Sequence, residues 1–331
     1  MEEQIRKDIR DNIYTKLQTN YNISNLKELN GYQNFVCQGT IDGESYILRI
    51  SHDSHRSYPE LASEIKFINL LAENNLSVAR PVEISTDKFL EQIESKKELY
   101  FLSIFEKAKG VDWHKKEHSE QNFFNAGKAL GKIHRTSQNT EIKFKREPWY
   151  KNQYLEIAKD VIPEAEIIDR LDKFMEELAR LPKSQKSYGL THGDYFYGNL
   201  IYNGDEITVI DFDEAEYNWF IYDIAVYLFY YLLGGKPKNM DIDYNKELFR
   251  HFIAGYNQVN QIDPDLLEKL PLFFRLREFV LLSSIYRSYY PDLGQWQQDY
   301  IEVTEHRIKN NIPFVDIDYK KIYQNIINGG D

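Results

Sequence analysis

The chain has 331 residues, of which 42% are hydrophobic and 28% charged, so it can form one large or two modest apolar cores. With 10 prolines, 16 glycines and 15% aromatic residues, its composition excludes collagen-like and disordered proteins. The net charge of -11 lies mostly in residues 191–331 and argues against nucleic-acid binding, which requires a basic face. It suits metal ions or cationic ligands, although a merely solvated acidic surface explains most of these charges equally well.

The first residues of the chain and its longest apolar run lead us to expect a cytoplasmic protein with no membrane partner. The first twelve residues, MEEQIRKDIRDN, lack the apolar core of a secretory signal. The longest apolar run, residues 224–233, is about half the length that a bilayer requires, so we expect a buried helix there. Cys37 is the only cysteine, which excludes an intrachain disulfide and cysteine-built metal sites. We expect it to be a small buried hydrophobe.

The first hundred residues alternate short strand-like runs with turn signals. Strands are predicted at residues 27–29, 35–40, 45–50 and 99–105, and Asp42-Gly43 is a strong hairpin signal. Alternation in residues 46–50 places Tyr46, Leu48 and Ile50 on one face of the strand, so Arg49 points away from that apolar face.

A helix is predicted next, over residues 60–74. Its apolar residues Leu61, Ile65, Ile68 and Leu71 form a stripe at helical spacing, and Glu64 lies beside that stripe. A glutamate on a helix face is ordinarily solvated. We therefore assign Glu64 a role only if it forms an ion pair, for which Arg49 is the candidate partner.

After residue 105 the pattern changes to long helices. They are predicted at residues 121–136, 167–181, 221–233, 246–257, 266–289 and 297–310. A polar, β-like segment, residues 188–213, interrupts them with a predicted hairpin of strands 200–202 and 208–210 around Asn203-Gly204-Asp205. A polar break of this kind in a helical region usually serves a functional site.

Three side chains of this segment carry chemistry. Asp194 and Asn199 are five residues apart on a loop, and Asp211 ends a short apolar strand after the hairpin. A carboxylate for a hydroxyl proton, together with an amide and a second carboxylate for Mg²⁺, is the set that phosphoryl transfer requires. Alternatively, Asp194 and Asn199 are turn residues that bond their own backbone, but this does not explain Asp211.

The run His192-Gly193-Asp194 with Asn199, followed by Ile210-Asp211-Phe212-Asp213, resembles the aminoglycoside phosphotransferase and choline kinase family, relatives of the protein kinases. The resemblance implies an α+β, two-lobed protein-kinase-like fold. Its small N-terminal β-sheet lobe, with one helix, would be residues 1–106 and bind nucleotide. Its larger, mainly helical lobe, residues 107–331, would hold the catalytic loop and the acceptor pocket.

The resemblance also assigns roles in the polar segment. Asp194 is then the catalytic base, and Asn199 and Asp211 bind Mg²⁺. His192 and Asp213 support the loop. Asp223 resembles the family's buried aspartate that braces this loop, but a charge favoured by a helix N-terminus explains it about as well.

In the N-terminal part the resemblance assigns the binding of ATP or GTP. The turn around Gly31 and Asn34 resembles the nucleotide loop, and the connection containing Glu106 and Ala108 resembles the hinge that receives the base. Arg49 occupies the position of the usual lysine, and Glu64 that of its helix partner. Arginine can grip phosphate in a bidentate way but differs from lysine in length and shape.

The expected function is transfer of the γ-phosphate of ATP or GTP to a hydroxyl of a small molecule, such as an aminoglycoside, an amino alcohol or a homoserine-like acceptor. A protein serine/threonine kinase of the same fold and a pseudokinase-like nucleotide-binding module are the alternatives. Asp211-Phe212-Asp213 also matches the metal-binding pattern of nucleotide-sugar transferases, and His192 with Asp194 could belong to a hydrolytic metal site. Neither of these readings explains Asn199 or the N-terminal strands.

Overall fold

The computed structural model describes residues 3–29, 31–112, 119–233, 238 and 240–328, which divide into two compact units. Unit 1 comprises Met1–Gly110, Ile142–Arg146 and Thr208–Asp213. Unit 2 comprises Val111–Glu141, Glu147–Ile207 and Glu214–Asp331. The change at Gly110 lies close to the boundary expected at residue 106. The two later segments of unit 1 lie in the part of the sequence that was assigned to the helical lobe.

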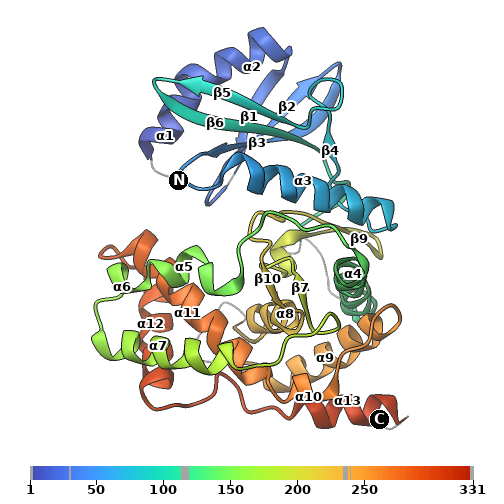
Figure 1. Cartoon of the computed structure of the whole chain (residues 1–331), viewed down its shortest axis with the longest axis vertical. Coiled ribbons are helices and arrows are strands. Elements are labelled where there is room, and N and C mark those ends of the chain that lie inside the picture. Colours follow the sequence, from blue (N-terminus) through green and yellow to red (C-terminus); the bar gives the residue numbers. More distant parts are fainter. Residues whose placement is uncertain (1–2, 30, 113–118, 234–237, 239, 329–331) are drawn as a thin grey trace. The chain divides into compact units, whose positions relative to one another are not determined.

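Unit 1 is built on an antiparallel sheet (Figure 1). Its strands are β1 (Ser24–Leu29), β2 (Phe35–Ile41), β3 (Glu44–His52), β4 (Pro81–Val82), β5 (Leu90–Ser95) and β6 (Glu98–Glu106). Their order is β1-β2-β3-β6-β4, and β5 also pairs with β6. The four predicted strands are present and longer than predicted, whereas β4 and β5 were not expected.

Helices cover both faces of this sheet. On one face α1 (Glu3–Asp8), a π-helical turn (Ile9–Ile13) and α2 (Tyr14–Tyr21) share a core with Leu48 and Ile50 of β3. On the other, α3 (Tyr58–Glu73) packs Leu61 and Ile65 against Leu90 and Phe101. The expectation of one helix here counted α3 alone, because the N-terminal stripe of Ile9, Ile13 and Leu17 was overlooked.

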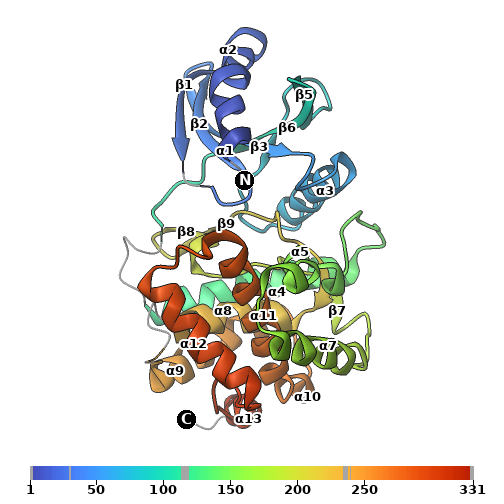
Figure 2. The same ribbon diagram turned by 90° about the vertical axis from the view of Figure 1, so that its left-hand side faces the viewer.

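Unit 2 is mainly helical (Figures 1 and 2). Its helices are α4 (Glu120–Asn139), α5 (Gln153–Glu156), α6 (Ala158–Val161), α7 (Ala165–Ala179), α8 (Ile221–Leu233), α9 (Ile242–Asn257), α10 (Pro264–Leu267), α11 (Leu270–Tyr289), α12 (Gln295–Lys309) and α13 (Tyr319–Ile327). The centre is α8, which is buried at every position except Tyr230 and packs against α9 and α11. Helix 266–289 was predicted as one element, but α11 begins only at Leu270, with Pro271 in its first turn.

Short strands interrupt the helices, as the sequence predicted. β7 (Tyr188–Leu190) pairs with β10 (Tyr217–Trp219), and β8 (Leu200–Asn203) forms a hairpin with β9 (Glu206–Val209). The chain from Thr208, at the end of β9, belongs to unit 1, where Val209 exchanges backbone hydrogen bonds with Ser77 and Ala79. Among the helices that the structure describes, we find none that is both long and apolar enough to cross a membrane. The fold is therefore the mixed α+β type expected, with an antiparallel sheet followed by a helical part.

Candidate active site

The loop that follows β7 in unit 2 contains His192, Asp194 and Asn199. Strand β7 is paired with β10, and just beyond it the backbone N–H and the hydroxyl of Thr191 both donate to the carbonyl of Glu216, at 2.9 and 2.8 Å. Gly193 has a φ of +80°, and a Cβ there would lie 1.9 Å from the carbonyl oxygen of Glu214. Only glycine fits both constraints, so the sharp turn before Asp194 is encoded at this position.

The Asp223 carboxylate on α8 holds the backbone of this loop. It accepts the N–H groups of His192 at 2.8 Å and Gly193 at 2.9 Å, and the side chains of Asp223 and His192 are fully buried. The Asp223 carboxylate also contacts His134 of α4, whose Nε2 lies 3.0 Å from it. The other ring nitrogen of His134, Nδ1, lies 3.0 Å from the Tyr256 hydroxyl. Burial lowers the pKa of His134 against the opposing effect of Asp223, so a neutral ring donates its Nε2–H to the carboxylate.

Within the loop, Asn199 is bonded to Asp194. Its Nδ2 donates to the main-chain oxygen of Asp194 at 2.9 Å and to its Oδ2 at 3.3 Å. The amide nitrogen is therefore turned toward Asp194, which leaves Oδ1 of Asn199 as the oxygen that can coordinate a cation. Asp194 is partly exposed, whereas Asn199 is buried.

A cation from α11 contacts the other oxygen of Asp194. Nη2 of Arg277 donates to Asp194 Oδ1 and to the hydroxyl of Tyr230, which is 2.6 Å away. Arg277 is only 7% exposed, and its guanidinium carbon lies 5.0 Å from the centre of the Tyr230 ring. The two oxygens of Asp194 thus face an arginine and an amide donor.

Asp211 and Asp213 follow β9 in unit 1. Asp211 is exposed and adopts a left-handed backbone with a φ of 62°, an uncommon conformation that tends to occur at functional sites. Asp213 is buried and its Oδ2 lies 2.6 Å from Nε2 of His55. Although burial alone would raise it, the pKa of Asp213 is lowered by His55, Arg56 and Arg49.

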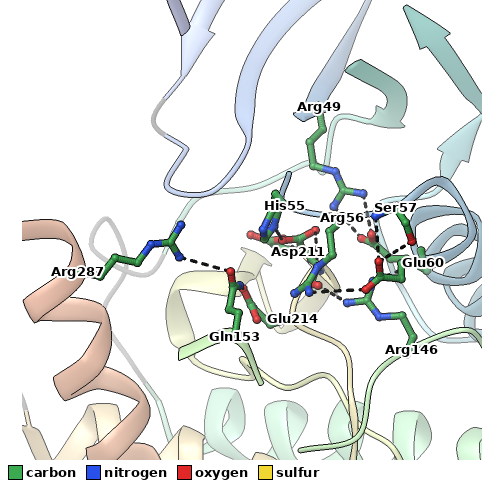
Figure 3. Close-up of polar contacts among 12 residues, drawn as sticks. Arg49, His55, Arg56, Ser57, Glu60, Arg146, Gln153, Asp211, Glu214 and Arg287 are labelled. Carbon is green, nitrogen blue, oxygen red and sulfur yellow. Dashed lines mark hydrogen bonds and ion pairs between the residues drawn. The ribbon is translucent and has the colours of Figure 1, made fainter. Parts of the chain in front are cut away.

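The basic residues around Asp213 come from two other segments of unit 1. His55 and Arg56 lie between β3 and α3, and Arg146 belongs to the segment after α4 and donates to the main-chain oxygen of Asp213. Figure 3 shows these three residues gathered near Asp211. This basic surrounding keeps Asp213 ionised and held in place.

Arg49 and Glu64 meet on the face of the sheet covered by α3. Nη1 and Nη2 of Arg49 each lie 2.7 Å from one oxygen of Glu64, and both side chains are buried. Although burial opposes the charge, Glu64 raises the pKa of Arg49 above its ordinary value. The alternation in β3 predicted the direction of Arg49, and the pair gives Glu64 the partner that its helix position required.

The remaining residues of the expected nucleotide region also lie in unit 1. A Cβ at Gly31 would lie 2.5 Å from the carbonyl oxygen of Asn34, so this turn is tight; Asn30 lies outside the described residues. Asn34 is buried, and its Oδ1 has no hydrogen-bond partner among the described residues. Glu106 ends β6, its N–H bonded to the Arg80 carbonyl at 2.8 Å, and Ala108 follows in an irregular segment.

Sequence reasoning missed His134, Arg277 and the basic residues around Asp213. His134 ends an apolar helical stripe, a weak signal that fits any buried histidine. Arg277 has no local signal, because it lies 83 residues from its partner Asp194 in the chain. Cys37 is buried as expected, and burial raises the pKa of its thiol to about 12.

Comparison with known proteins assigns the chain to a family. Residues 26–268 match the model of the phosphotransferase enzyme family. The amicoumacin kinase of Bacillus subtilis (strain 168) is 30% identical over 298 residues, which cover 88% of each chain. The structure of amicoumacin kinase hAmiN in complex with AMP-PNP, Ca²⁺ and Ami has a TM-score of 0.88 at 27% identity, over 97% of this chain and 100% of that one.

A microcompartment-associated aminopropanol kinase shares the fold alone, with a TM-score of 0.72 at 18% identity over 96% of this chain and 97% of that one. The chain belongs to the phosphotransferase enzyme family. It has the kinase-like fold and is a phosphotransferase that acts on a hydroxyl group of a small molecule. The resemblance seen in the loop motifs is thereby confirmed.

Proposed function

We propose that this phosphotransferase transfers the γ-phosphate of ATP to a hydroxyl of amicoumacin or of a compound closely related to it. One observation carries the choice of acceptor: the similarity to amicoumacin kinases extends over 88% of both sequences and over 97% of this chain in the structural comparison. ATP is preferred to GTP as donor because the similar hAmiN structure contains the ATP analogue AMP-PNP. The reaction is assigned to the cytoplasm, where ATP is available.

The catalytic role goes to Asp194. Its carboxylate is partly exposed at the end of a braced loop, so it can accept the proton of an acceptor hydroxyl as that oxygen attacks the phosphorus. Asp223 and His192 act through the backbone of the loop and hold Asp194 in place. Preorganisation of this kind contributes to catalysis by reducing the cost of orientation.

The metal assigned to the site is Mg²⁺, bound through Asn199 and Asp211. Oxygen ligands suit a hard cation such as Mg²⁺. Asn199 can supply its amide oxygen, and Asp211, which is exposed, can supply a carboxylate oxygen. The neighbouring Asp213 keeps a buried Oδ1 without a hydrogen-bond partner among the described residues. When bound, Mg²⁺ would neutralise charge on the phosphates. Asp213 supports Asp211 through the backbone N–H it directs at Asp211 Oδ1, 3.5 Å away.

The nucleotide is assigned to Gly31, Asn34, Arg49, Glu106 and Ala108. The tight turn at Gly31 is assigned to the phosphates, and the irregular segment that follows Glu106 and contains Ala108 is assigned to the base. Arg49 supplies a permanent positive charge that Glu64 orients. This charge is suited to the phosphates of the donor.

The test is a phosphate-transfer assay with purified protein, Mg·ATP and amicoumacin, in which a monophosphorylated product is detected by mass spectrometry. Spectinomycin, 1-amino-2-propanol, choline, homoserine and a generic protein substrate form the comparison panel. We expect amicoumacin to have the highest kcat/KM and Asp194→Asn to lower kcat by about 10²–10⁴-fold, the contribution of a general base, to a measurable residual rate.

Preference for another member of the panel would contradict the proposed acceptor while leaving the family reaction intact. Full transfer by Asp194→Asn would contradict the assigned base. Replacing ATP by GTP, and Mg²⁺ by EDTA, tests the donor and the metal in the same assay.

A further inference from the structure

Arg277 is a buried cation in direct contact with the proposed base. It projects from α11, and its Nη2 serves both Asp194 Oδ1 and the Tyr230 hydroxyl. Tyr230 belongs to α8, and its ring lies under the guanidinium at 5.0 Å and against Phe196 at 4.6 Å between ring centres. The arginine is therefore fixed by an aromatic face on one side and by a carboxylate at its end.

The burial of Arg277 makes the contact with Asp194 hard to break. Burial opposes its charge, but Tyr230, Asp194 and Tyr222 raise the pKa of Arg277 well above its ordinary value, so it stays protonated. The structure records one ion pair for this arginine within the described residues, the one with Asp194. Removal of Asp194 would leave the buried charge of Arg277 uncompensated, so the ion pair restricts the positions of both side chains.

The carboxylate of Asp194 is thus held from two directions. Arg277 bonds Oδ1, and Asn199 donates to Oδ2 at 3.3 Å. A free aspartate would rotate about its terminal torsion, which has a broad energy minimum. Two opposed donors remove this freedom and fix the direction in which the unshared lone pairs can receive the hydroxyl proton of the acceptor.

We propose that Arg277 is a positioning residue of the phosphotransfer site, which aligns the Asp194 carboxylate for the acceptor hydroxyl by clamping Oδ1 opposite the Asn199 amide. The inference rests on the proposed function in one respect, since it takes Asp194 as the base. It goes beyond that function because it places a residue of α11 in the machinery. Arg277 acts through Asp194, so its loss should lower kcat and leave the KM for nucleotide unchanged.

A second buried arginine–carboxylate pair, which joins α12 to α11, supplies a control. Arg307 of α12 is 6% exposed, and its Nε lies 2.7 Å from Oε1 of Glu278, a fully buried residue that follows Arg277 in α11. Like the Arg277–Asp194 pair, this is an arginine–carboxylate ion pair with a buried arginine, but Glu278 is buried more deeply than Asp194 and also pairs with Arg275. Among the described residues, Arg307 has no recorded ion pair with Asp194. A variant at Arg307 therefore reports the cost of disturbing a buried arginine–carboxylate pair at α11.

The experiment compares Arg277→Met, Arg277→Lys and Arg307→Met with the wild type. The probe is the member of the acceptor panel that the wild-type protein phosphorylates, with Mg·ATP as donor, and urea unfolding gives the folded fraction of each variant. Per folded molecule, we expect Arg277→Met to lose about 100-fold in kcat, as a misplaced group does. Arg277→Lys should recover part of this loss, and Arg307→Met should lose stability but keep kcat within about two-fold, as expected away from the site.

A double-mutant cycle with Asp194→Asn tests the route of the effect. If Arg277 acts through Asp194, Arg277→Met adds almost nothing to the loss caused by Asp194→Asn. The proposal is overturned if Arg277→Met keeps wild-type kcat per folded molecule, if the two losses multiply, or if Arg307→Met lowers kcat equally. Wild-type activity of Asp194→Asn alone would instead refute the assigned base, so the two failures can be told apart.

Discussion

Arg49 engages both oxygens of Glu64 with its two terminal nitrogens, a geometry that the compact ammonium group of lysine cannot reproduce. The family resemblance places a lysine at this position, paired with the helix glutamate that corresponds to Glu64. The structure keeps the pair and buries it. Its Nε has no hydrogen-bond partner among the described residues, so the guanidinium still has a donor to offer.

The first prediction concerns this pair. Arg49→Ala should raise the KM for ATP and lower kcat, because both positioning and charge at the phosphates are lost. It should also lower the free energy of unfolding by about 3–5 kcal/mol, because Glu64 is left as a buried unpaired charge. Arg49→Lys should keep a large part of the activity. Steady-state kinetics and urea unfolding measure both effects.

A double variant separates stability from nucleotide binding. Arg49→Met combined with Glu64→Leu removes both charges, so it should recover much of the stability but none of the ATP affinity. Wild-type kinetics in Arg49→Ala or in this double variant would exclude Arg49 from the nucleotide site.

The second prediction concerns Glu216, whose carbonyl anchors Thr191. Burial raises the pKa of Glu216 to about 7, against the opposing hydrogen bonds from Asn152 at 2.9 Å and Asn218 at 2.8 Å. Because the folded state holds the proton more tightly than the unfolded state, whose pKa is near 4.5, stability falls as pH rises between these two values. The loss from this group is roughly 3 kcal/mol between pH 4.5 and 7.

The measurement is the free energy of unfolding in urea at pH 5 and pH 8 for the wild type and Glu216→Gln. The glutamine does not ionise, so the variant should lack this decrease and show a smaller difference between the two pH values. Identical pH dependence of the two proteins would show that Glu216 ionises normally in the folded state.

At the scale of elements, α4 and α9 pack unusually closely. A Cβ at Gly127 would lie 1.8 Å from the carbonyl oxygen of Phe252, and one at Gly255 would lie 1.8 Å from that of Phe124. Gly131, one turn further along α4, is also tightly packed, since a Cβ there would lie 2.9 Å from the carbonyl oxygen of Tyr256. The contact matters for the site, because α4 carries His134 to Asp223.

The third prediction tests this contact. Gly127→Ala should lower the free energy of unfolding by roughly 2–3 kcal/mol, because the new methyl group meets rigid backbone. Gly131→Ala should cost less, since its Cβ would lie 2.5 Å from a side-chain methyl of Val259 and reach the nearest backbone atom, the Tyr256 carbonyl oxygen, only at 2.9 Å. Asn139→Ala, at an exposed position of the same helix, should change stability by less than about 0.5 kcal/mol. Equal stability of Gly127→Ala and wild type, measured by urea unfolding, would disprove the close contact.

Local patterns predicted the elements whose signals are local. Alternation located β3 and the direction of Arg49, helical spacing located α3, and α8 begins and ends as predicted. The pairing of His134 with Asp223 joins residues 89 positions apart, and that of His55 with Asp213 joins residues 158 apart. Such contacts depend on tertiary packing, for which a single sequence carries no periodic signal.

At the scale of the whole molecule, the residues assigned to phosphoryl transfer are divided between the two units. Unit 1 contains Arg49, Glu64 and Asp211, and unit 2 contains Asp194 and Asn199. The motif spacing could group Asp194, Asn199 and Asp211 because the loop and the hairpin that carry them are continuous in sequence. It could not predict that residues 208–213 belong to unit 1, because the backbone bonds of Val209 to Ser77 and Ala79 decide this.

The last prediction separates donor binding from catalysis, because Asp211 is assigned to the metal and Asp194 to the acceptor proton. Mg·ATP at about 100 times its Kd should stabilise the folded protein by about 2.7 kcal/mol through mass action, which raises Tm by several degrees. Asp211→Ala should lose most of this shift in Tm, because it removes a proposed metal ligand. Asp194→Ala should keep the shift but abolish transfer, because a base that receives the acceptor proton contributes little to donor binding. Addition of EDTA to the wild type should reproduce the effect of Asp211→Ala.

Thermal unfolding with and without nucleotide, together with the transfer assay, measures both properties. An equal loss of the shift in the two variants would contradict the assignment of separate roles, and no shift with either ATP or GTP at millimolar concentration would contradict nucleotide binding itself.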